Sequence, residues 1–327
     1  MKILVTGAAG FIGFHLTLRL ANDGHDVVAL DNLNDYYAVS LKGARLERLG
    51  DVPFHTIDIA DLKALDALFA QERFTHVVHL AAQAGVRYSV DHPHEYGLSN
   101  LTGFLNILDV CNRYQVEHLL YASSSSVYGR QETLPFRETD AANQPASIYA
   151  ASKRANEMMA YSYADLHRLP ATGMRFFTVY GPWGRPDMAP CMFAASLLRD
   201  EPIDVFNHGR MARDFTYIDD VVECIVRLLP LPPKGQDSAP HEIYNLGRGK
   251  PVALLDFVET LESAMGTTAT KHFKQMQLGD IEKTWADTEK LRSVIDYTPQ
   301  ISLEVGIGRF VRWLESHHEL VLESVDA

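Results

Sequence analysis

The sequence lacks most of the features that would assign it to a disulfide-stabilised, metal-binding or membrane-spanning class. It has three cysteines in 327 residues (Cys111, Cys191 and Cys224), with neither paired nor metal-type spacing. Its fourteen histidines form no metal-binding motif, so we expect no metal. No apolar run approaches the ~20 residues that a membrane span requires. We therefore expect a protein of a reducing compartment, with its cysteines buried.

The chain also has little positive charge. Its 30 lysines and arginines are outnumbered by 42 aspartates and glutamates, which gives a formal net charge of −12. This balance argues against nucleic acid or an anionic membrane as a partner. The first residues read as a strand, without the charged region, apolar run and cleavage site of a signal peptide. We expect a cytoplasmic location.

What the sequence does contain is a regular alternation of short apolar runs and helical patterns. The runs predict strands at residues 3–6, 26–30, 53–57, 76–79, 118–123, 171–176 and 242–246. Helical patterns lie between them, at residues 11–23, 62–71, 99–114 and 148–167. This rhythm predicts an α/β fold, a doubly wound parallel Rossmann sheet with helices on both faces. It breaks after Tyr180, and residues from about Pro251 onward predict a smaller helical cap.

A glycine-rich turn joins the first predicted strand to the first helix. Gly7 allows the tight turn, Gly10 lets the backbone approach a pyrophosphate, and Gly13 allows close packing of helix on strand. Asp31, at the end of the second strand, is placed to accept both ribose hydroxyls and to repel a 2′-phosphate, which favours NAD over NADP. Asp58 is placed to touch the adenine amine, although a helix cap explains it almost as well. A turn without a ligand, and an Asp31 that merely caps its loop, remain the alternatives.

The most informative pattern is Tyr149 with Lys153, downstream of a serine run at 123–126. A phenol ionises near pH ~10 and is a poor base at neutral pH. A lysine one helical turn later lies on the same face and favours the phenolate. With a hydroxyl donor nearby, these groups can remove a proton from an alcohol while a nicotinamide takes the hydride. A surface tyrosine and lysine one turn apart are the alternative.

Taken together, these motifs resemble the extended short-chain dehydrogenases that act on nucleotide sugars. The resemblance rests on residues 7–13, 123–129, 149–153 and 213–217, and it covers nearly the whole chain. Its most specific part, at residues 31–37, 84–89 and 175–187, is similar to UDP-glucuronate 4-epimerases. The resemblance implies bound NAD, a Rossmann domain at 1–179 with 214–247 returning to it, and a UDP-sugar domain at 180–213 and 248–327. One departure is the segment after Asp280, which continues Ile-Glu-Lys-Thr-Trp where Val-Pro-Ala is more typical.

The resemblance also implies the site residues. Ser124, Tyr149 and Lys153 are the expected catalytic residues, with Ser123, Ser125 and Ser126 as neighbours that a shift of register could confuse with Ser124. The expected cofactor contacts are Gly7, Gly10, Phe11, Ile12, Gly13, Asp31, Asn32, Asp58, Ile59, Leu80, Ala81, Ala82, Tyr149, Lys153 and Phe176. At the UDP end, Arg213 is expected to clamp the diphosphate, while Gln277 and Asp280 meet the ribose. The uracil is expected between Val205, Phe206 and Asn207, and Arg87 is expected to face the substrate.

A uronate substrate sets a further requirement, because oxidation at C4 leaves its carboxylate β to a ketone and prone to leave as carbon dioxide. We expect Ser125, Ser126 and Thr178 to hold this carboxylate, with Arg185 as the charged candidate. Relatives that dehydrate or decarboxylate carry an acid after the catalytic hydroxyl, whereas this chain has serines there.

The expected reaction is 4-epimerisation of UDP-glucuronate and UDP-galacturonate through a 4-keto intermediate. A neutral UDP-hexose 4-epimerase, a UDP-glucuronate decarboxylase or net dehydrogenase, and an NAD-responsive binding protein are the alternatives. The resemblance further implies a homodimer, formed by the helices at 99–114 and 148–167.

Overall fold

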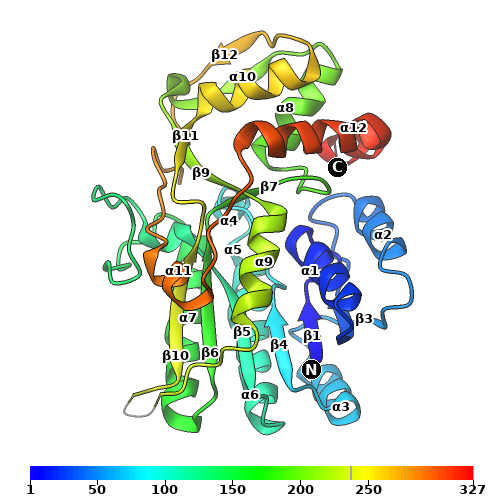
Figure 1. Ribbon diagram of the computed structural model, residues 1–327, viewed down its shortest axis with the longest axis vertical. Coiled ribbons are helices and arrows are strands. Elements are labelled where there is room, and N and C mark those ends of the chain that lie inside the picture. Colours follow the sequence, from blue (N-terminus) through cyan, green and yellow to red (C-terminus); the bar gives the residue numbers. More distant parts are fainter. Residues whose placement is uncertain (236–237, 278, 327) are drawn as a thin grey trace.

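The centre of the protein is a parallel sheet of seven strands. The computed structural model describes residues 1–235, 238–277 and 279–326 (Figure 1). The strand order is β10-β6-β5-β4-β1-β2-β3, and every neighbouring pair is parallel. The strands are β1 (Lys2–Thr6), β2 (Asp26–Asp31), β3 (Phe54–Thr56), β4 (His76–His79), β5 (His118–Ser124), β6 (Ala171–Phe176) and β10 (His241–Leu246). The predicted doubly wound sheet is confirmed.

Helices cover both faces of this sheet because its strands are apolar on both sides. In β1, Ile3 and Val5 pack into one core with the helices α1 (Phe11–Asn22) and α9 (Ile218–Leu228), whereas Leu4 packs into a second core with α3 (Leu62–Glu72) and α6 (Phe104–Arg113). Side chains alternate across a strand, so a continuous apolar run needs cover on each face. The helices around the sheet are α1 (Phe11–Asn22), α2 (Val39–Glu47), α3 (Leu62–Glu72), α6 (Phe104–Arg113), α7 (Ile148–His167), α9 (Ile218–Leu228) and α11 (Glu289–Ile295).

Above the carboxyl ends of the strands lies a smaller lobe (Figure 1). Its helices are α8 (Ala189–Leu198), α10 (Leu254–Met265) and α12 (Leu303–Asp326). Two small sheets accompany them. Strands β7 (Thr178–Tyr180), β9 (Ala212–Tyr217) and β11 (Pro251–Ala253) form one, and β8 (Ile203–Val205) and β12 (Lys271–Phe273) form the other. The first of these sheets spans the expected boundaries at 179/180 and 213/214, and those boundaries stay a prediction.

Some predicted elements differ in detail. The helix expected at 99–114 is a π-helical segment η1 (Gly97–Gly103) followed by α6, and a short α5 (Pro93–Tyr96) precedes it. A short helix, α4 (Tyr88–Asp91), precedes them, and 3₁₀ turns η2 (Ser125–Tyr128) and η3 (Phe206–Gly209) follow β5 and β8. The C-terminal third is not wholly a cap, since α11 packs on β10 and α9. Helices α2 and α9 carry no assignment in the sequence-based prediction.

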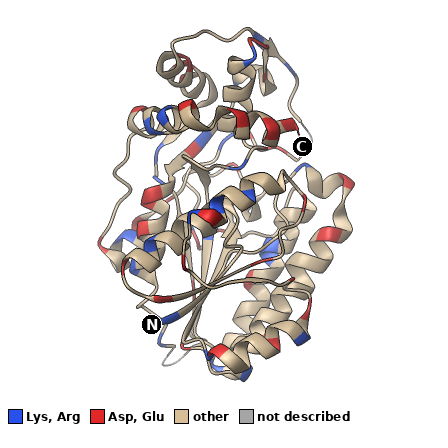
Figure 2. Ribbon diagram, turned by 90° about the vertical axis from the view of Figure 1, so that its right-hand side faces the viewer, with Lys and Arg blue, Asp and Glu red and all other residues tan. Residues whose placement is uncertain are grey.

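The positions of the charged residues and of the cysteines agree with what the composition predicts. Charged positions lie mainly on the helices and loops around the sheet, with both signs interspersed (Figure 2). The cysteines are free and buried, as expected. Within the described ranges, no helix combines the length and the apolar character needed to cross a membrane.

Candidate active site

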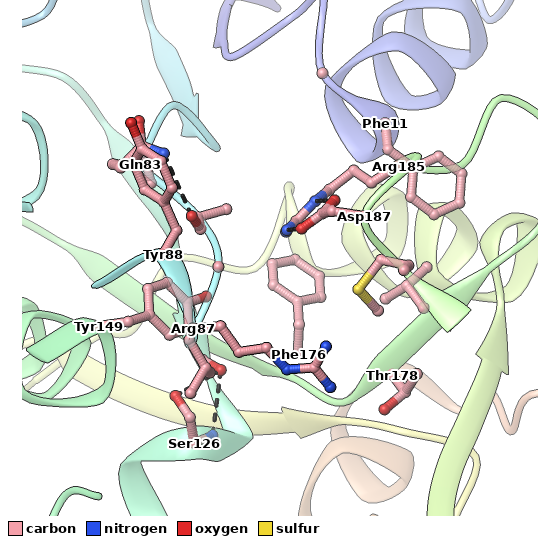
Figure 3. Close-up of a pocket in the computed structure, with 18 of the residues that line it drawn as sticks. Phe11, Gln83, Arg87, Tyr88, Ser126, Tyr149, Phe176, Thr178, Arg185 and Asp187 are labelled. Carbon is pink, nitrogen blue, oxygen red and sulfur yellow. Dashed lines mark hydrogen bonds and ion pairs between the residues drawn. The ribbon is translucent and has the colours of Figure 1, made fainter. Parts of the chain in front are cut away.

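A cavity of about 1000 Å³ opens where the carboxyl ends of the strands meet the upper lobe (Figure 3). The sheet order reverses between β1 and β4, and parallel sheets bind ligands at such a point. The lining residues come from loops that follow β1, β2, β4, β5 and β6, and from segments of the smaller lobe. One continuous space therefore joins the two lobes.

The glycine turn lies at one end of this cavity. Gly7 has a positive φ of 71°, and a Cβ on it would lie 2.7 Å from the Ala81 backbone nitrogen. A Cβ on Gly13 would lie 2.0 Å from the Gly7 carbonyl oxygen. Gly10 is the N-cap of α1 and brings no side chain that could cap the helix. The first N–H groups of α1 thus stay accessible to an anion, and the turn fits a dinucleotide pyrophosphate.

Asp31 lies beside this turn, buried at the end of β2. Its carboxylate accepts hydrogen bonds from the backbone N–H of Ala9 at 3.1 Å and of Leu33 at 2.9 Å. These bonds fix the carboxylate between the glycine turn and the next loop, and an ionised carboxylate keeps further lone pairs for ribose hydroxyls. The structure therefore brings together the two features that the sequence assigns to NAD.

Ser124, Tyr149 and Lys153 share one wall of the cavity. Ser147 caps α7 by accepting a hydrogen bond from the Ala150 N–H at 3.1 Å, which places Tyr149 in the first helical turn. Ser124 ends β5, and its Oγ accepts from the Ser126 N–H at 3.2 Å and from the Ser126 hydroxyl at 2.9 Å. The expected trio is thus assembled from one strand end and one helix.

Burial acts on both titratable members of this trio. It raises the pKa of Tyr149, against the opposing effect of a hydrogen bond with Ser124. Among charged groups, Arg185 lowers the pKa of this phenol and Asp187 raises it. Burial also lowers the pKa of Lys153 to about 8, and its ammonium donates to the Ala122 carbonyl at 2.9 Å. A buried phenol of this kind needs positive charge nearby before it can act as a base at neutral pH.

Hydroxyl and guanidinium groups surround the space next to Tyr149. Ser125, Ser126, Thr178 and Arg185 all line the cavity, as expected. Figure 3 shows Thr178 and Arg185 across the cavity from Ser126 and Tyr149. A sugar held between these two sides would meet short hydroxyl side chains and the guanidinium of Arg185.

Two arginines with different partners lie at the end of the cavity assigned to UDP. Arg213 is paired with no carboxylate within the described residues, and its Nη1 donates to the carbonyls of Ala212 and Glu282 at 3.0 and 3.1 Å. Arg87 lies 3.5 Å from the Asp280 carboxylate and over the Phe206 ring. Neither Asp214 nor Asp219 pairs with Arg213, because Asp214 accepts backbone N–H groups and Asp219 pairs with Arg309.

Most of the predicted site residues line this one cavity. The cofactor set includes Gly7, Gly10, Phe11, Ile12, Gly13, Asp31, Asn32, Ile59, Leu80, Ala81, Ala82, Tyr149, Lys153 and Phe176. The substrate set includes Arg87, Ser125, Ser126, Thr178, Arg185, Phe206, Arg213, Gln277 and Asp280.

Three predicted residues are not part of the cavity lining. The Asp58 carboxylate accepts from the Asn32 amide at 3.0 Å and from the Ala60 N–H at 2.8 Å, while Asp61 caps α3. Val205 is fully buried in β8. The Asn207 amide donates to the Arg210 carbonyl at 2.8 Å. Their expected contacts with the nucleotides remain predictions.

Tyr36, Lys42 and Asp187 are among the polar cavity residues to which sequence reasoning assigned no role. The Tyr36 hydroxyl donates to the Asp187 carboxylate at 2.9 Å, and Lys42 donates to the Asn34 carbonyl and side-chain oxygens, both at 2.6 Å. Tyr36 and Asp187 do stand in the segments 31–37 and 175–187 that carry the resemblance, but that resemblance assigned them no role. The partnership of Tyr36 with Asp187 spans 151 residues and could not be read from either segment.

The fold and the cavity define a class, the dinucleotide-binding proteins with the tyrosine–lysine arrangement of extended short-chain dehydrogenases. Within that class, the chain belongs to the NAD dependent epimerase/dehydratase family, whose model matches residues 3–247.

Relatives and solved structures place the chain further within this family. It is 44% identical to a probable UDP-glucuronate 4-epimerase of Rhizobium meliloti, over 97% of this chain and 98% of that protein. It is also 44% identical to UDP-glucuronate 4-epimerase 4 of Arabidopsis thaliana, over 97% of this chain and 76% of that one. A solved UDP-glucuronic acid 4-epimerase from Bacillus cereus, in complex with UDP-glucuronic acid and NAD, matches with a TM-score of 0.87 and 32% identity, over 97% and 99% of the two chains.

Proposed function

We propose that this protein is a UDP-glucuronate 4-epimerase, which interconverts UDP-glucuronate and UDP-galacturonate with tightly bound NAD. One observation carries the proposal. A single cavity contains the glycine turn, the trio Ser124, Tyr149 and Lys153, and a hydroxyl-rich pocket with Arg185. These parts match, in order, a dinucleotide, a secondary alcohol and a carboxylate on the same sugar.

The glycine turn and Asp31 hold the cofactor. The N–H groups at the start of α1 receive the pyrophosphate, and the Asp31 carboxylate receives the adenosine ribose hydroxyls. Bound NAD supplies one function, which is to take the hydride from C4 and return it. Because each cycle regenerates the oxidised form, the reaction needs no second substrate.

Tyr149 moves the proton. As phenolate, it removes the proton of the 4-hydroxyl, and it returns this proton when C4 is reduced again. Ser124 hydrogen-bonds the same oxygen, and Lys153 holds the nicotinamide ribose. The positive charge of Arg185 lowers the pKa of Tyr149 against the effect of burial. The ammonium of Lys153, one helical turn away, would favour the phenolate in the same way.

The configuration at C4 inverts because the 4-keto sugar turns within the site between the two hydride transfers. While it does so, the C5 carboxylate must not align with the carbonyl π system, or carbon dioxide is lost. Ser125, Ser126 and Thr178 donate short hydrogen bonds to that carboxylate, and Arg185 adds a charged one. Positions 125 and 126 are serines, so the chain lacks there the acidic residue that a dehydratase or a decarboxylase would use.

The UDP group lies at the opposite end. Arg213 clamps the diphosphate, as its lack of a described carboxylate partner leaves its charge available to phosphate oxygens. Arg87 and Phe206 face the same end, and Gln277 and Asp280 meet the ribose. Val205 supports the uracil site from β8, and Asn207 flanks it.

The neutral UDP-hexose 4-epimerases are the second candidate. A UDP-glucose 4-epimerase from Thermotoga maritima, solved with UDP-glucose, matches with a TM-score of 0.88 and 30% identity, over 97% of this chain and 100% of that one. The two activities differ in the C5 substituent. Arg185 beside the hydroxyl groups favours the uronate, because a neutral hydroxymethyl group needs no cation.

We further propose a cytoplasmic homodimer. Leu98, Leu101 and Leu105 on η1 and α6, and Met158 and Tyr161 on α7, are large apolar side chains exposed to solvent. Packing these two segments against their copies would bury them in a four-helix arrangement. The division into an NAD-binding domain (1–179 with 214–247) and a UDP-sugar domain (180–213 with 248–327) belongs to the same proposal.

Incubation of the purified protein with UDP-glucuronate, without added NAD, tests the function. We expect UDP-galacturonate as product, with no net NADH and little carbon dioxide. Deuterium at C4 should remain in the inverted product, because the hydride never leaves the site. Conversion of UDP-glucose alone would favour the neutral epimerase instead, and washout of the deuterium into water would exclude the redox cycle.

A further inference from the structure

Arg185 enters the cavity already paired with a carboxylate. Its Nε donates to Oδ1 of Asp187 at 3.0 Å, and its Nη2 pairs with Oδ2 of the same residue. The Tyr36 hydroxyl donates to Oδ2 at 2.9 Å. Figure 3 shows the pair facing into the cavity. The site that should attract a substrate carboxylate therefore contains a resident carboxylate.

The loop that carries this pair is firmly held. Arg45 is fully buried and donates from Nη2 to the carbonyls of Trp183 at 2.8 Å and Gly184 at 3.3 Å. Its Nη1 donates to the Ala9 carbonyl at 2.8 Å, in the glycine turn. These bonds restrain Arg185 and Asp187 relative to the cofactor site. Asp187 is thus a fixed neighbour of Arg185.

Asp187 is ionised in this setting. Burial raises the pKa of its carboxyl, but the charge of Arg185 and the hydrogen bonds from Arg185 and Tyr36 outweigh burial and bring the pKa below its ordinary value. The pair as a whole is close to neutral. Compared with a lone arginine, it offers an incoming carboxylate fewer free N–H donors, because Nε and Nη2 already donate to Asp187. It also offers much less attraction, because the Asp187 charge repels the carboxylate.

Arg213 provides a contrast in the same cavity. It lies at the end assigned to the diphosphate, and within the described residues no carboxylate pairs with it. A diphosphate has to stay bound through the whole cycle, so an arginine without an acidic partner suits it. The C5 carboxylate has a different task, since it must leave its position when the 4-keto sugar turns and must settle again afterwards.

We propose that Asp187 is a positioning residue that acts through Arg185: its negative charge weakens the hold of Arg185 on the substrate carboxylate, so that the sugar can turn between the two hydride transfers. This inference rests on the proposed function and deepens it. It assigns to Asp187 and its hydroxyl partner Tyr36 a part in setting the turnover rate. It predicts that stronger binding of the uronate carboxylate lowers kcat.

The test is Asp187→Asn, which keeps the size of the side chain and removes its charge. Asp23→Asn is the matched control, because Asp23 also pairs with an arginine, Arg19, at 2.8 Å but lies outside the cavity. Steady-state kinetics with UDP-glucuronate should show KM and kcat falling together in Asp187→Asn, each by about tenfold for the loss of one nearby charge. Asp23→Asn should retain both constants.

Binding without turnover gives a second measurement. UDP-glucuronate and UDP are titrated into Tyr149→Phe protein with and without Asp187→Asn. We expect Asp187→Asn to lower the Kd of UDP-glucuronate and to leave the Kd of UDP unchanged, because UDP has no carboxylate. A Kd for UDP-glucuronate that is unchanged or higher, or an unchanged kcat, overturns the inference. Wild-type protein that does not convert UDP-glucuronate would instead overturn the proposed function, so the two failures are distinguishable.

Discussion

Arg175 on β6 and Glu157 on α7 form a bidentate ion pair close to the carboxyl end of β5, where Ser124 lies. Nε and Nη2 of Arg175 each donate to one Glu157 carboxylate oxygen, both at 2.8 Å. The side chains are 2% and 1% exposed. The Ser123 hydroxyl and Arg154 complete the set of donors to Glu157. The pair thus joins α7, which carries Tyr149 and Lys153, to the ends of β5 and β6.

Arg175→Met is expected to destabilise the protein by about 3–5 kcal/mol, because it leaves a buried carboxylate without its main partner. Arg292→Met, in an exposed pair with Glu289, is the control and should leave stability nearly unchanged, because water screens exposed ion pairs. Urea denaturation at neutral pH measures both. Burial opposes ionisation of Glu157, yet Arg175 holds its pKa below 4.5. The benefit of the pair is therefore present at neutral pH and should fade as the pH falls through the folded-state pKa.

Lys153→Met should stabilise the nucleotide-free protein at pH 7 while it removes activity. The folded-state pKa of Lys153 is lowered from 10.5 to about 8 by burial. At pH 7 the folded protein bears the cost of this buried charge, about 3 kcal/mol, partly offset by the hydrogen bond to Ala122. Between about pH 8 and 10.5 the unfolded chain retains a proton that the folded protein releases, so wild-type stability rises there. Thermal unfolding at pH 7 and pH 10 should show the advantage of the variant shrinking, and an equal advantage at both pH values would contradict this account.

Gly13→Ala is expected to abolish NAD retention. The new Cβ would lie 2.0 Å from the Gly7 carbonyl oxygen, so helix α1 and the glycine turn must separate. Gly43→Ala, on α2, has open space at its Cβ and should be neutral or stabilising by up to about 1 kcal/mol. The cofactor released on heat denaturation, measured by absorbance, distinguishes the two variants. Normal NAD content in Gly13→Ala would argue against a pyrophosphate at this turn.

Tyr149→Phe should retain the fold and bound NAD but lose turnover by about 10²–10⁴-fold, the range for removal of a general acid–base group. Tyr163→Phe, on the same helix but outside the cavity, is the control. Product formation from UDP-glucuronate is the measurement. Turnover near the wild-type level in Tyr149→Phe would require another base.

Thr178→Ala should raise the fraction of decarboxylated product, since the 4-keto intermediate loses one hydroxyl donor to its carboxylate. Thr298→Ala, outside the cavity, should leave the product ratio unchanged. Released carbon dioxide and the pentose nucleotide are quantified against UDP-galacturonate. An unchanged ratio in Thr178→Ala would remove this residue from the carboxylate pocket.

The sequence by itself determined the sheet, because apolar runs of strand length alternate with helical patterns and leave little freedom in topology. It also determined the glycine turn and the spacing of Tyr149 and Lys153, since both depend on neighbours within one turn of chain. The geometry of both motifs is local. The glycine turn depends on a positive φ and on the absence of a Cβ, whereas the 3.6-residue repeat of the helix places Tyr149 and Lys153 on one face.

Only the tertiary structure decided which charges face one another in the cavity. Asp187 and Tyr36 are separated by 151 residues, yet they meet at 2.9 Å beside Arg185. The Asp58 carboxylate accepts hydrogen bonds from the Asn32 amide and from the Ala60 N–H of its own turn, and the Asn32 contact could not be read from the sequence. The physical reason is that partners of a polar side chain are chosen by the packing of loops that no local pattern encodes, whereas strands and helices bring their hydrogen bonds with them.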